Sequence, residues 1–484
     1  MKIRHSPPVI AVLALFPFNI LGAVHCVDLN SSNPVSPYAD WSTAATDIQS
    51  AVDAANAGDI VLVTNGVYQT GGRLAPSGQT TNRVAVTKAV TVQSINGPAA
   101  TIIRGYQVPG TTNGASAVRC VYLTNNAVLS GFTLTGGATT YTSDHYGGGI
   151  YCKSTSAIVS NCVLTGNAAS SGGGACYGTF YNCTISSNGL VSDGGGVVYA
   201  TLYNCVVAGN SSTYVGGGVE GGNLYNCLVV NNTASSSGGG AYYVNAMVNC
   251  TIVGNFAGSE GGGLYEGNAT NCIVYFNTGY AETANMFSAN GHHCCTTPTN
   301  YMAADNFTNA PLFVDRTGGN FRLQTNSPCI NTGDLAGVIG TTDLDRRPRV
   351  VVGKVDVGAY EFQGAGMGEF ISWLQRYGLP TDGSADFTDL DGDGLDNWQE
   401  WMADTSPLDG NDCLHITNFT RSGNYNTLWW SSKSTRLYQV QRCAALDPAA
   451  PWETIITNSE PGWNNVGFDN TDPQYFYRIL AIRP

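Results

Sequence analysis

The chain has 484 residues, of which 60 are glycine, 10% are aromatic and only 11% are charged, and its formal net charge is −13. The length favours more than one domain. The low fraction of charged residues, together with the aromatic content, excludes a disordered chain. The negative charge disfavours nucleic acid and anionic membranes as partners.

The first residues have the pattern of an export signal. Lys2 and Arg4 precede an apolar run from Val9 to Leu21, which ends in small residues near Ala23. The run is too short to span a bilayer as an anchor. We therefore expect residues 1–25 to be a signal peptide and the protein to be secreted, extracellular or held at the cell surface, without a transmembrane anchor.

Residues 45–57 predict an amphipathic helix. Ile48, Val52 and Ala55 recur at helical spacing, and Gly58 follows as a stop signal. Short strand-like runs begin immediately afterwards, the first at residues 60–63. A helix in this place covers the open end of a stack of strands, which would otherwise be a template for adding further strands.

Residues 146–280 consist of a repeat of about 22 residues. Each copy contains a glycine triplet, an Asn-Cys pair and, five residues after the cysteine, a second asparagine. The pairs are Asn161-Cys162, Asn182-Cys183, Asn204-Cys205, Asn226-Cys227, Asn249-Cys250 and Asn271-Cys272, and the second asparagines are Asn167, Asn188, Asn210, Asn232, Asn255 and Asn277. A fixed period of this size is typical of a solenoid, in which each coil buries its apolar face only against its neighbours.

The residues around each cysteine predict which side chains face the core. The positions two after and three before it are always apolar, as Leu164 and Val159 are around Cys162. Strand alternation points the cysteine and the aliphatic residue inward, which predicts a column of buried free thiols. The asparagine before the cysteine falls out of this alternation, so we expect a left-handed bend there. With coils about 4.8 Å apart, these six asparagines are expected to stack, each amide bonding to the next.

These repeats resemble the right-handed parallel β-helix proteins of the pectate-lyase-like superfamily. The pairing of a Gly-Gly-Gly-aliphatic run with an x-x-x-Asn end, as in residues 163–167, is also similar to the repeats of polymorphic outer-membrane adhesins. The segments 311–315, 321–323, 327–330, 343–349 and 355–362 resemble the closing segment of secreted bacterial β-helix proteins of the choice-of-anchor type. The resemblance implies a mainly β fold, with a β-helix over residues 38–362 and an attachment or sorting role for the residues after 362.

The cysteines outside the repeat are better candidates for disulfides than the stacked ones. They are Cys294, Cys295 and Cys329, and separately Cys413 and Cys443. His292 and His293 stand directly before Cys294, and these residue types also bind metals. Adjacent residues of an extended chain point to opposite faces, however, so we expect a closing loop held by a disulfide instead.

A calcium-loop motif follows a short linker at residues 363–369. Phe370 and Trp373 mark one face of a short helix, and residues 389–400 then match the EF-hand loop throughout, giving a helix–calcium loop–helix segment over residues 370–412. The expected ligands of Ca²⁺ are Asp389, Asp391, Asp393 and Glu400 through their carboxylates, Leu395 through its carbonyl and Asn397 through water. A single loop resembles dockerin and thrombospondin type 3 repeats, which implies a structural ion. Residues 413–484 alternate polar and apolar residues in short runs and predict a small antiparallel β-sandwich.

The repeats carry few of the charges that catalysis requires. There is no Lys or Arg between residues 154 and 315, whereas β-elimination needs a base and cations. A hydrolase needs two carboxylates roughly 5–9 Å apart. The sequence register offers no such pair, because Asp193 and Glu260 are expected three coils apart, and Glu220 and Glu266 two. Asp144 and His145, with Lys153, are the best remaining catalytic candidates.

Two functional hypotheses arise from these features. Tyr181, Tyr203 and Tyr225 lie two residues before their cysteines and predict an aromatic column that suits flat sugar rings. The first hypothesis is an adhesin-like carbohydrate-binding protein whose partner is a polysaccharide or cell-surface glycan. The alternative is a polysaccharide lyase or glycoside hydrolase with a divergent site near Asp144 and Lys153, and a purely architectural spacer is a third possibility. The oligomeric state stays open.

Overall fold

The computed structural model describes residues 9–10 and 22–482, apart from residues 77, 190, 281–282, 299–302, 325, 352–353, 364–365, 382–384, 386–387, 424, 444–451, 458–459 and 470–475. The chain divides into two compact units, Leu21–Phe362 on one hand and Gln363–Pro484 with Met1–Ile20 on the other. Most of the predicted signal peptide lies outside the described residues, and its cleavage stays a prediction. Among the described residues, no helix has the length and apolar run that crossing a bilayer requires.

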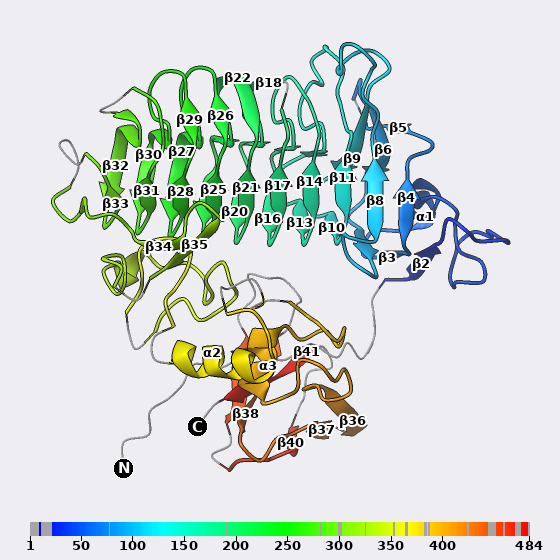
Figure 1. Cartoon of the computed structure of the whole chain (residues 1–484). Coiled ribbons are helices and arrows are strands. Elements are labelled where there is room, and N and C mark those ends of the chain that lie inside the picture. The colour runs from blue at the N-terminus through cyan, green and yellow to red at the C-terminus, as the bar shows by residue number, and fades with distance from the viewer. Residues whose placement is uncertain are drawn as a thin grey trace. The chain divides into compact units, whose positions relative to one another are not determined.

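Residues 21–362 form a parallel β-helix, whose coils lie side by side along one axis (Figure 1). One sheet takes one strand from each coil: β4 (Gly66–Tyr68), β8 (Thr101–Arg104), β11 (Thr133–Thr135), β14 (Val163–Thr165), β17 (Thr184–Ser186), β21 (Val206–Ala208), β25 (Leu228–Val230), β28 (Thr251–Val253), β31 (Ile273–Tyr275) and β33 (Cys295–Thr296).

The largest sheet forms two further walls of the solenoid. Its strands are β2 (Val24–Val27), β3 (Ile60–Val63), β5 (Arg73–Leu74), β6 (Thr81–Val86), β7 (Thr91–Ser94), β9 (Val118–Leu123), β10 (Val128–Ser130), β12 (Ile150–Cys152), β13 (Ile158–Ser160), β15 (Ala175–Cys176), β16 (Thr179–Tyr181), β19 (Val197–Val198), β20 (Thr201–Tyr203), β23 (Val219–Glu220), β24 (Asn223–Tyr225), β27 (Ala241–Val248), β30 (Leu264–Thr270) and β32 (Met286–His292). A third sheet contains β18 (Val191–Asp193), β22 (Ser211–Val215), β26 (Thr233–Ala234) and β29 (Phe256–Ala257). The sheet begins at Val24, well before residue 38, where the sequence placed the start of the solenoid.

Equivalent residues of successive coils lie in register. Leu164 pairs with Ile185, which pairs with Val207, and the column continues coil by coil. These aliphatic side chains and the cysteines between them are buried in one continuous core. The inward face predicted from strand alternation is confirmed.

The thiol column has one member more than the sequence suggested. The Cys250 N–H donates to Cys272 Sγ at 3.4 Å. Cys272 Sγ donates to Met247 O at 3.5 Å, and one coil later Cys294 Sγ donates to Ala269 O at 3.4 Å in the same way. Cys294 therefore extends the ladder and faces the core. All fifteen cysteines are free thiols in this structure, so the disulfides expected from Cys294, Cys295, Cys329, Cys413 and Cys443 are not formed in it.

The asparagine before each cysteine adopts the left-handed bend that the sequence predicted, with φ between 51° and 54° at Asn161, Asn182, Asn204, Asn226, Asn249 and Asn271. The amide ladder assigned to these six residues was wrong, because it runs through the second asparagines instead. The ladder bonds run from Nδ2 to Oδ1, from Asn167 to Asn188 (3.0 Å), on to Asn210 (3.0 Å), Asn232 (2.9 Å), Asn255 (3.0 Å) and Asn277 (2.9 Å). The second asparagines are buried inside the coil, where parallel side chains repeat at the coil spacing. At the bend, in contrast, Asn226 and Asn271 donate outward to carbonyls of the closing segment.

The glycine triplets pass where backbones of neighbouring coils approach most closely. Gly194, the first of its triplet, has φ +61°, and a Cβ added at Gly196 would lie only 2.5 Å from Gly218 O. A left-handed residue followed by a backbone contact of this kind admits only glycine. The triplets thus let the coils turn tightly at the stacking distance.

A short helix closes the first coil, as predicted (Figure 1). This helix, α1 (Ile48–Ala54), is shorter than the predicted range 45–57 because Asp47 caps its N-terminus by accepting from the Ser50 N–H. Ile48, Ala51 and Val52 pack into the solenoid core.

The closing segment wraps the outer side of the coils. It contains the hairpin β34 (Phe313–Asp315) and β35 (Asn320–Leu323) and the 3-10 turn η2 (Leu335–Gly337). Phe313 and Phe321 pack on outward residues such as Leu228 and Ile273. Arg349 and Glu361, both fully buried, form an ion pair of 2.6 Å, which accounts for the charged residues of the closing motif.

The second unit contains two helices and two small antiparallel sheets. The helices are α2 (Gly366–Arg376) and α3 (Asn397–Ala403); one sheet has β36 (Ile416–Ser422), β37 (Tyr425–Trp430) and β40 (Asn465–Asp469), and the other has β38 (Leu437–Cys443), β39 (Glu453–Thr457), β41 (Phe476–Ile482) and β1 (Val9–Ile10). The two sheets share one core that includes Leu428, Tyr438 and Ile479, as the predicted β-sandwich requires. The linker is shorter than expected, because α2 begins at Gly366 and not at residue 370.

The amide ladder predicts an unequal effect of two asparagine substitutions in the same coil. Asn210→Ala leaves the Asn188 N–H and Nδ2 without their acceptor. Each orphaned buried group costs about 1–3 kcal/mol, so we expect a loss of about 3 kcal/mol or more in the free energy of unfolding. Asn204→Gly removes a side chain whose Oδ1 has no partner and keeps the left-handed backbone, so it should cost no more than about 1 kcal/mol. Denaturant unfolding measures both, and equal losses would contradict the ladder.

Candidate functional site

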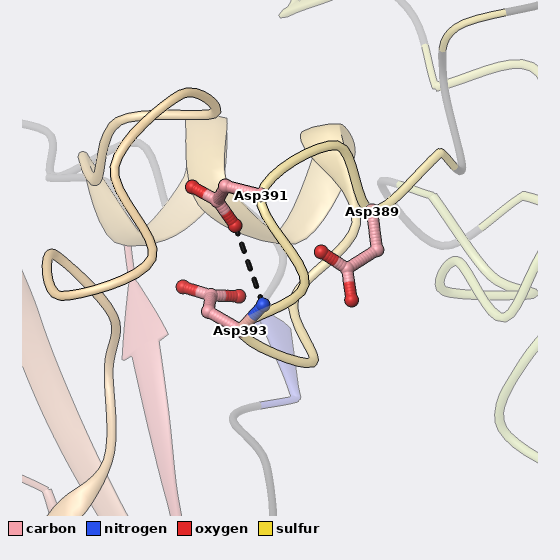
Figure 2. A group of neighbouring side chains, drawn as sticks. All are labelled: Asp389, Asp391 and Asp393. Atoms are coloured by element: carbon pink, nitrogen blue, oxygen red, sulfur yellow. Dashed lines mark hydrogen bonds between the residues drawn. The ribbon is translucent and has the colours of Figure 1, made fainter. Parts of the chain in front are cut away.

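The acidic loop brings three carboxylates together between α2 and α3. Oxygens of Asp389, Asp391 and Asp393 all lie within 4.8 Å of one another (Figure 2). The loop folds around Asp389, which accepts from the N–H groups of Gly392 (2.8 Å) and Gly394 (3.0 Å). Gly394 has φ +94°, the left-handed turn that the motif predicts. The residues therefore converge as a cation-binding loop requires.

The remaining predicted ligands leave oxygen atoms without partners beside this cluster. Glu400 is fully buried, and neither of its carboxylate oxygens has a hydrogen-bond partner. Asp391 Oδ2, Asp393 Oδ2 and Asn397 Oδ1 are buried and unpartnered as well. Burial and the neighbouring Asp391 raise the pKa of Glu400 to about 8. Buried carboxylate and amide oxygens without partners are the ligand type of a hard cation such as Ca²⁺, which takes six to eight oxygen ligands.

The segment is not a full helix–loop–helix. α3 follows the loop directly and is capped by Asp396, which accepts from the Gln399 N–H at 2.9 Å. α2 ends at Arg376, well before Asp389, and packs against α3 through Phe370 and Trp398. Among the residues described between Arg376 and Asp389, no helix leads into the acidic loop. Leu395 and Ala403 belong to the core of the sandwich, so the loop and the sandwich form one packed module.

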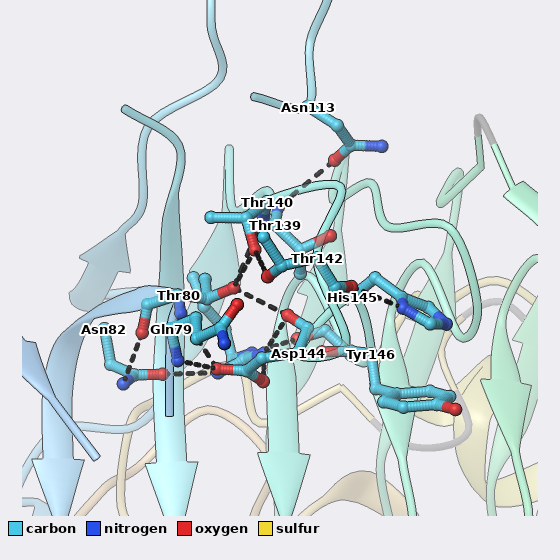
Figure 3. Close-up of polar contacts among 12 residues, drawn as sticks. Gln79, Thr80, Asn82, Asn113, Thr139, Thr140, Thr142, Asp144, His145 and Tyr146 are labelled. Carbon is cyan, nitrogen blue, oxygen red and sulfur yellow. Dashed lines mark hydrogen bonds and ion pairs between the residues drawn. The ribbon is translucent and has the colours of Figure 1, made fainter. Parts of the chain in front are cut away.

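The predicted acid–base pair at Asp144 and His145 does not come together. Asp144 lies in a dense polar network (Figure 3), where it accepts from the Gln79 and Thr80 N–H groups, both at 2.9 Å, and from Arg119 Nη2 at 2.7 Å. The Arg119 side chain is fully buried. This carboxylate accepts three hydrogen bonds and neutralises the buried Arg119. Its role is therefore structural.

His145 lies at the edge of that network, which it contacts through Thr142 (Figure 3), whereas Lys153 belongs to a different segment. His145 Nδ1 is 2.7 Å from Thr142 O, and the imidazole lies against the Tyr146 ring, with centroids 4.3 Å apart and planes tilted by 31°. Lys153 is exposed just after β12, and its N–H donates to Leu123 O at 2.8 Å. The Asp144 and His145 side chains therefore contact different partners, and Lys153 is exposed.

The predicted tyrosine column is present, but its rings stack face to face on one another. Tyr181 and Tyr203 stack with centroids 4.9 Å apart and planes 9° apart, and Tyr203 and Tyr225 stack at 4.8 Å and 21°. Both faces of the Tyr203 ring are thus covered by its neighbours. A sugar ring stacks on an aromatic face, and this column leaves none free at its centre.

A second set of tyrosines was missed by the sequence reasoning. The register column Cys176, Val198, Glu220, Tyr242 and Tyr265 follows the glycine triplets. The residue after each member is left-handed, at Tyr177, Tyr199, Gly221, Tyr243 and Glu266. Tyr199 and Tyr243 are 47% and 50% exposed. We call Tyr177, Tyr199, Glu220, Tyr242, Tyr243, Tyr265 and Glu266 the acidic tyrosine face.

Carboxylates sit among these rings. Tyr199 Oη donates to Glu220 Oε1 at 3.4 Å, while Glu220 Oε2 is buried without a partner. Burial, followed by the charge of Asp193, raises the pKa of Glu220 to about 7. A hydrogen bond to Glu266 raises the pKa of Tyr243. Asp193 and Glu220 therefore interact, although the sequence register paired each of them with another acid.

The signal for this face was present in the repeat but ambiguous. Val198, the register equivalent of Glu220, packs beside the first glycine of its triplet, since a Cβ on Gly194 would touch its Cγ2. The chain reverses direction at each glycine triplet. Asp193, before one triplet, therefore approaches Glu220, which follows the triplet of the next coil. Counting coils along the sequence does not predict this approach, because it ignores the reversal of the chain at the triplet.

The comparisons with known proteins concern the fold. Neither a family model nor a curated protein matches this sequence. Among solved structures, the chain is similar to pectate lyase Pel9A, with 15% identity over 70% of this chain and 96% of that one and a TM-score of 0.47. A rhamnogalacturonan lyase has 13% identity over 63% and 95%, with a TM-score of 0.37, and rice weevil pectin methyl esterase 11% over 55% and 79%, with 0.27.

The solenoid is a parallel β-helix. The chemistry has to be argued from the residues of this chain.

The Asp144 network predicts loss of stability on substitution. Asp144→Ala leaves the buried Arg119 guanidinium without its counter-ion, which should lower the free energy of unfolding by about 3–5 kcal/mol. His145→Ala removes one contact to a carbonyl and should cost less than about 1 kcal/mol. Urea unfolding of both variants checks this. A neutral Asp144→Ala variant would show that the ion pair does not hold this loop.

Proposed function

We propose that this protein is a secreted or cell-surface carbohydrate-binding β-helix, adhesin-like in role, that holds a glycan along the acidic tyrosine face. The observation that carries the proposal is the row of half-exposed tyrosines at left-handed positions, Tyr199 and Tyr243 above all, beside carboxylates. Tyrosine combines an apolar ring with a polar hydroxyl, and sites for organic ligands combine such rings with a few placed polar groups.

Repetition suits this face to a chain-like ligand. Its columns repeat at the coil spacing of about 4.8 Å, so equivalent contacts recur along the solenoid axis. A polymer of similar sugar units can meet several of them at once, and linked contacts of this kind strengthen binding without any single strong site.

The alternative, a lyase or hydrolase centred on Asp144, His145 and Lys153, gains no support from the geometry. Asp144 is held by three donors, and the other two side chains have separate surroundings. A general base must reach the proton it abstracts, and these residues offer no shared point for a substrate.

We further propose that the loop at residues 389–400 binds a structural Ca²⁺. The side chains of Asp389, Asp391, Asp393 and Glu400 would hold it, with Asn397 and the Leu395 carbonyl. The unpartnered oxygens of the buried Glu400 support this assignment. The ion would neutralise the clustered carboxylates and hold the loop against the sandwich, which shares Leu395 in its core.

Binding tests distinguish the two tyrosine sets. We expect the mature protein to bind at least one member of a panel of neutral, amino-sugar and uronate oligosaccharides. Tyr199→Asn with Tyr243→Asn, which keeps the left-handed backbone, should weaken that binding about tenfold or more, by removing two exposed rings. Tyr203→Leu serves as the control and should leave it within about twofold. Binding to no member of the panel would refute the proposed function, and loss in Tyr203→Leu alone would move the site to the stacked column.

Calcium removal should weaken one unit only. Chelation with EGTA, or Glu400→Gln, should lower the melting temperature of the module at residues 363–484 by about 10 °C or more, because ligand at 100 times its Kd stabilises by about 2.7 kcal/mol. The β-helix transition should stay in place, and the exposed Asp409→Asn is the matched control. Differential scanning calorimetry separates the two transitions. An unchanged melt together with no calcium uptake in titration calorimetry would contradict the site.

A further inference from the structure

The acidic tyrosine face has a one-sided charge. No Lys or Arg occurs between residues 154 and 315, and the histidines of this range, His292 and His293, face Asp305. Arg119, nearby in the preceding coils, is already bonded to Asp144 at 2.7 Å. A polyanionic glycan laid on this face would find negative charge and no counter-charge.

Glu220 is the most informative residue of the face. One of its oxygens accepts from Tyr199 Oη at 3.4 Å, and the other is buried without a partner. Tyr242 follows it directly in the register column, and the Tyr199 ring leans over Gly221, where an added Cβ would lie 2.4 Å from Tyr199 Cδ1. The raised pKa of Glu220 reflects burial and the charge of Asp193. A ligand cation near this carboxylate would offset the repulsion between Glu220 and Asp193.

A second carboxylate, Glu266, stands further along the solenoid, one position after Tyr265, the register equivalent of Glu220. It is two coils beyond Glu220, about 10 Å at 4.8 Å per coil, which is close to the length of a disaccharide. Tyr243 bonds to Glu266, and burial together with the charges of Glu266 and Glu260 raises the pKa of Tyr265. Two carboxylates, each beside tyrosine rings, thus lie two coils apart in neighbouring register columns.

We propose that the acidic tyrosine face recognises an amino-sugar polymer, with ring ammonium groups bound by Glu220 and Glu266 and sugar faces lying against the tyrosines. This inference rests on the proposed carbohydrate binding and names its ligand class. Ammonium groups are attracted both to carboxylates and to aromatic faces, and the face offers the two together. Polyuronates are the glycans that it excludes.

The test compares four probes of equal length on the full mature chain: glucosamine hexamer, N-acetylglucosamine hexamer, galacturonate hexamer and hexalysine. At pH 7 and low salt we expect the glucosamine hexamer to bind at least tenfold more tightly than the acetylated one, and the galacturonate hexamer not at all. Glu220→Gln and Glu266→Gln should each weaken glucosamine binding about three- to tenfold and leave acetylated binding unchanged. Glu369→Gln, an exposed acid of the other unit, is the charge-matched control and should have no effect.

Each other outcome has a definite meaning. Equal binding of the amino and acetylated hexamers, or tighter binding of galacturonate, overturns the ligand class while carbohydrate binding stands. Hexalysine binding as tightly as the glucosamine hexamer shows attraction by charge alone and overturns sugar recognition. Failure of every sugar probe here and of the wider panel refutes the proposed function itself. Circular dichroism melts of the variants establish that a loss of binding is not a loss of fold.

Discussion

Stacking of equivalent residues at one fixed spacing is the constraint on which the rest of this structure depends. A coil buries no core of its own, so Leu164, Ile185 and Val207 shield one another only because they share a register. A slip of one residue would turn the aliphatic and thiol columns outward. The buried amide ladder from Asn167 to Asn277 penalises such a slip further, because each bond needs the next asparagine at the same height.

The same constraint builds the outer surface. A residue type that recurs in the repeat becomes a column, and a left-handed position turns its side chain outward at the same place in every coil. Tyr177, Tyr199 and Tyr243 occupy such positions. Departures from the pattern then mark special sites, and Glu220 is one, a carboxylic acid in a column that otherwise holds Cys176, Val198 and tyrosines. Architecture and candidate binding face thus have one physical origin.

The sequence predicted what depends on periodicity and missed what depends on how the chain folds back. The inward cysteines and aliphatics, the bend at Asn182 and its equivalents, the cap at Ile48–Ala54 and the β-sandwich follow from alternation, spacing and capping rules. The ladder was assigned to the wrong asparagine because both recur with the same period, and only burial tells them apart. Cys294 looked like a disulfide partner because the repeat loses its regular spacing just before it.

The candidate sites also differ in how far the sequence could predict them. The acidic loop at residues 389–400 is a local motif, so its residues could be read from the chain, although the distance of α2 from it could not. Asp144 seemed free because its partners, Gln79, Thr80 and Arg119, are distant in sequence. Contacts between coils made one carboxylate structural and brought Asp193 to Glu220, and neither follows from residue types alone.

Deletion of a single coil tests the stacking rule most directly. Asn167 and Asn188 are equivalent and 21 residues apart, so removal of residues 168–188 should bring Gly189 into place with every column in register. Thermal unfolding followed by circular dichroism should then remain cooperative, with a midpoint close to that of the full chain. Removal of residues 168–178, about half a coil, should abolish the transition. Equal behaviour of the two deletions, whether both fold or both fail, would contradict the account.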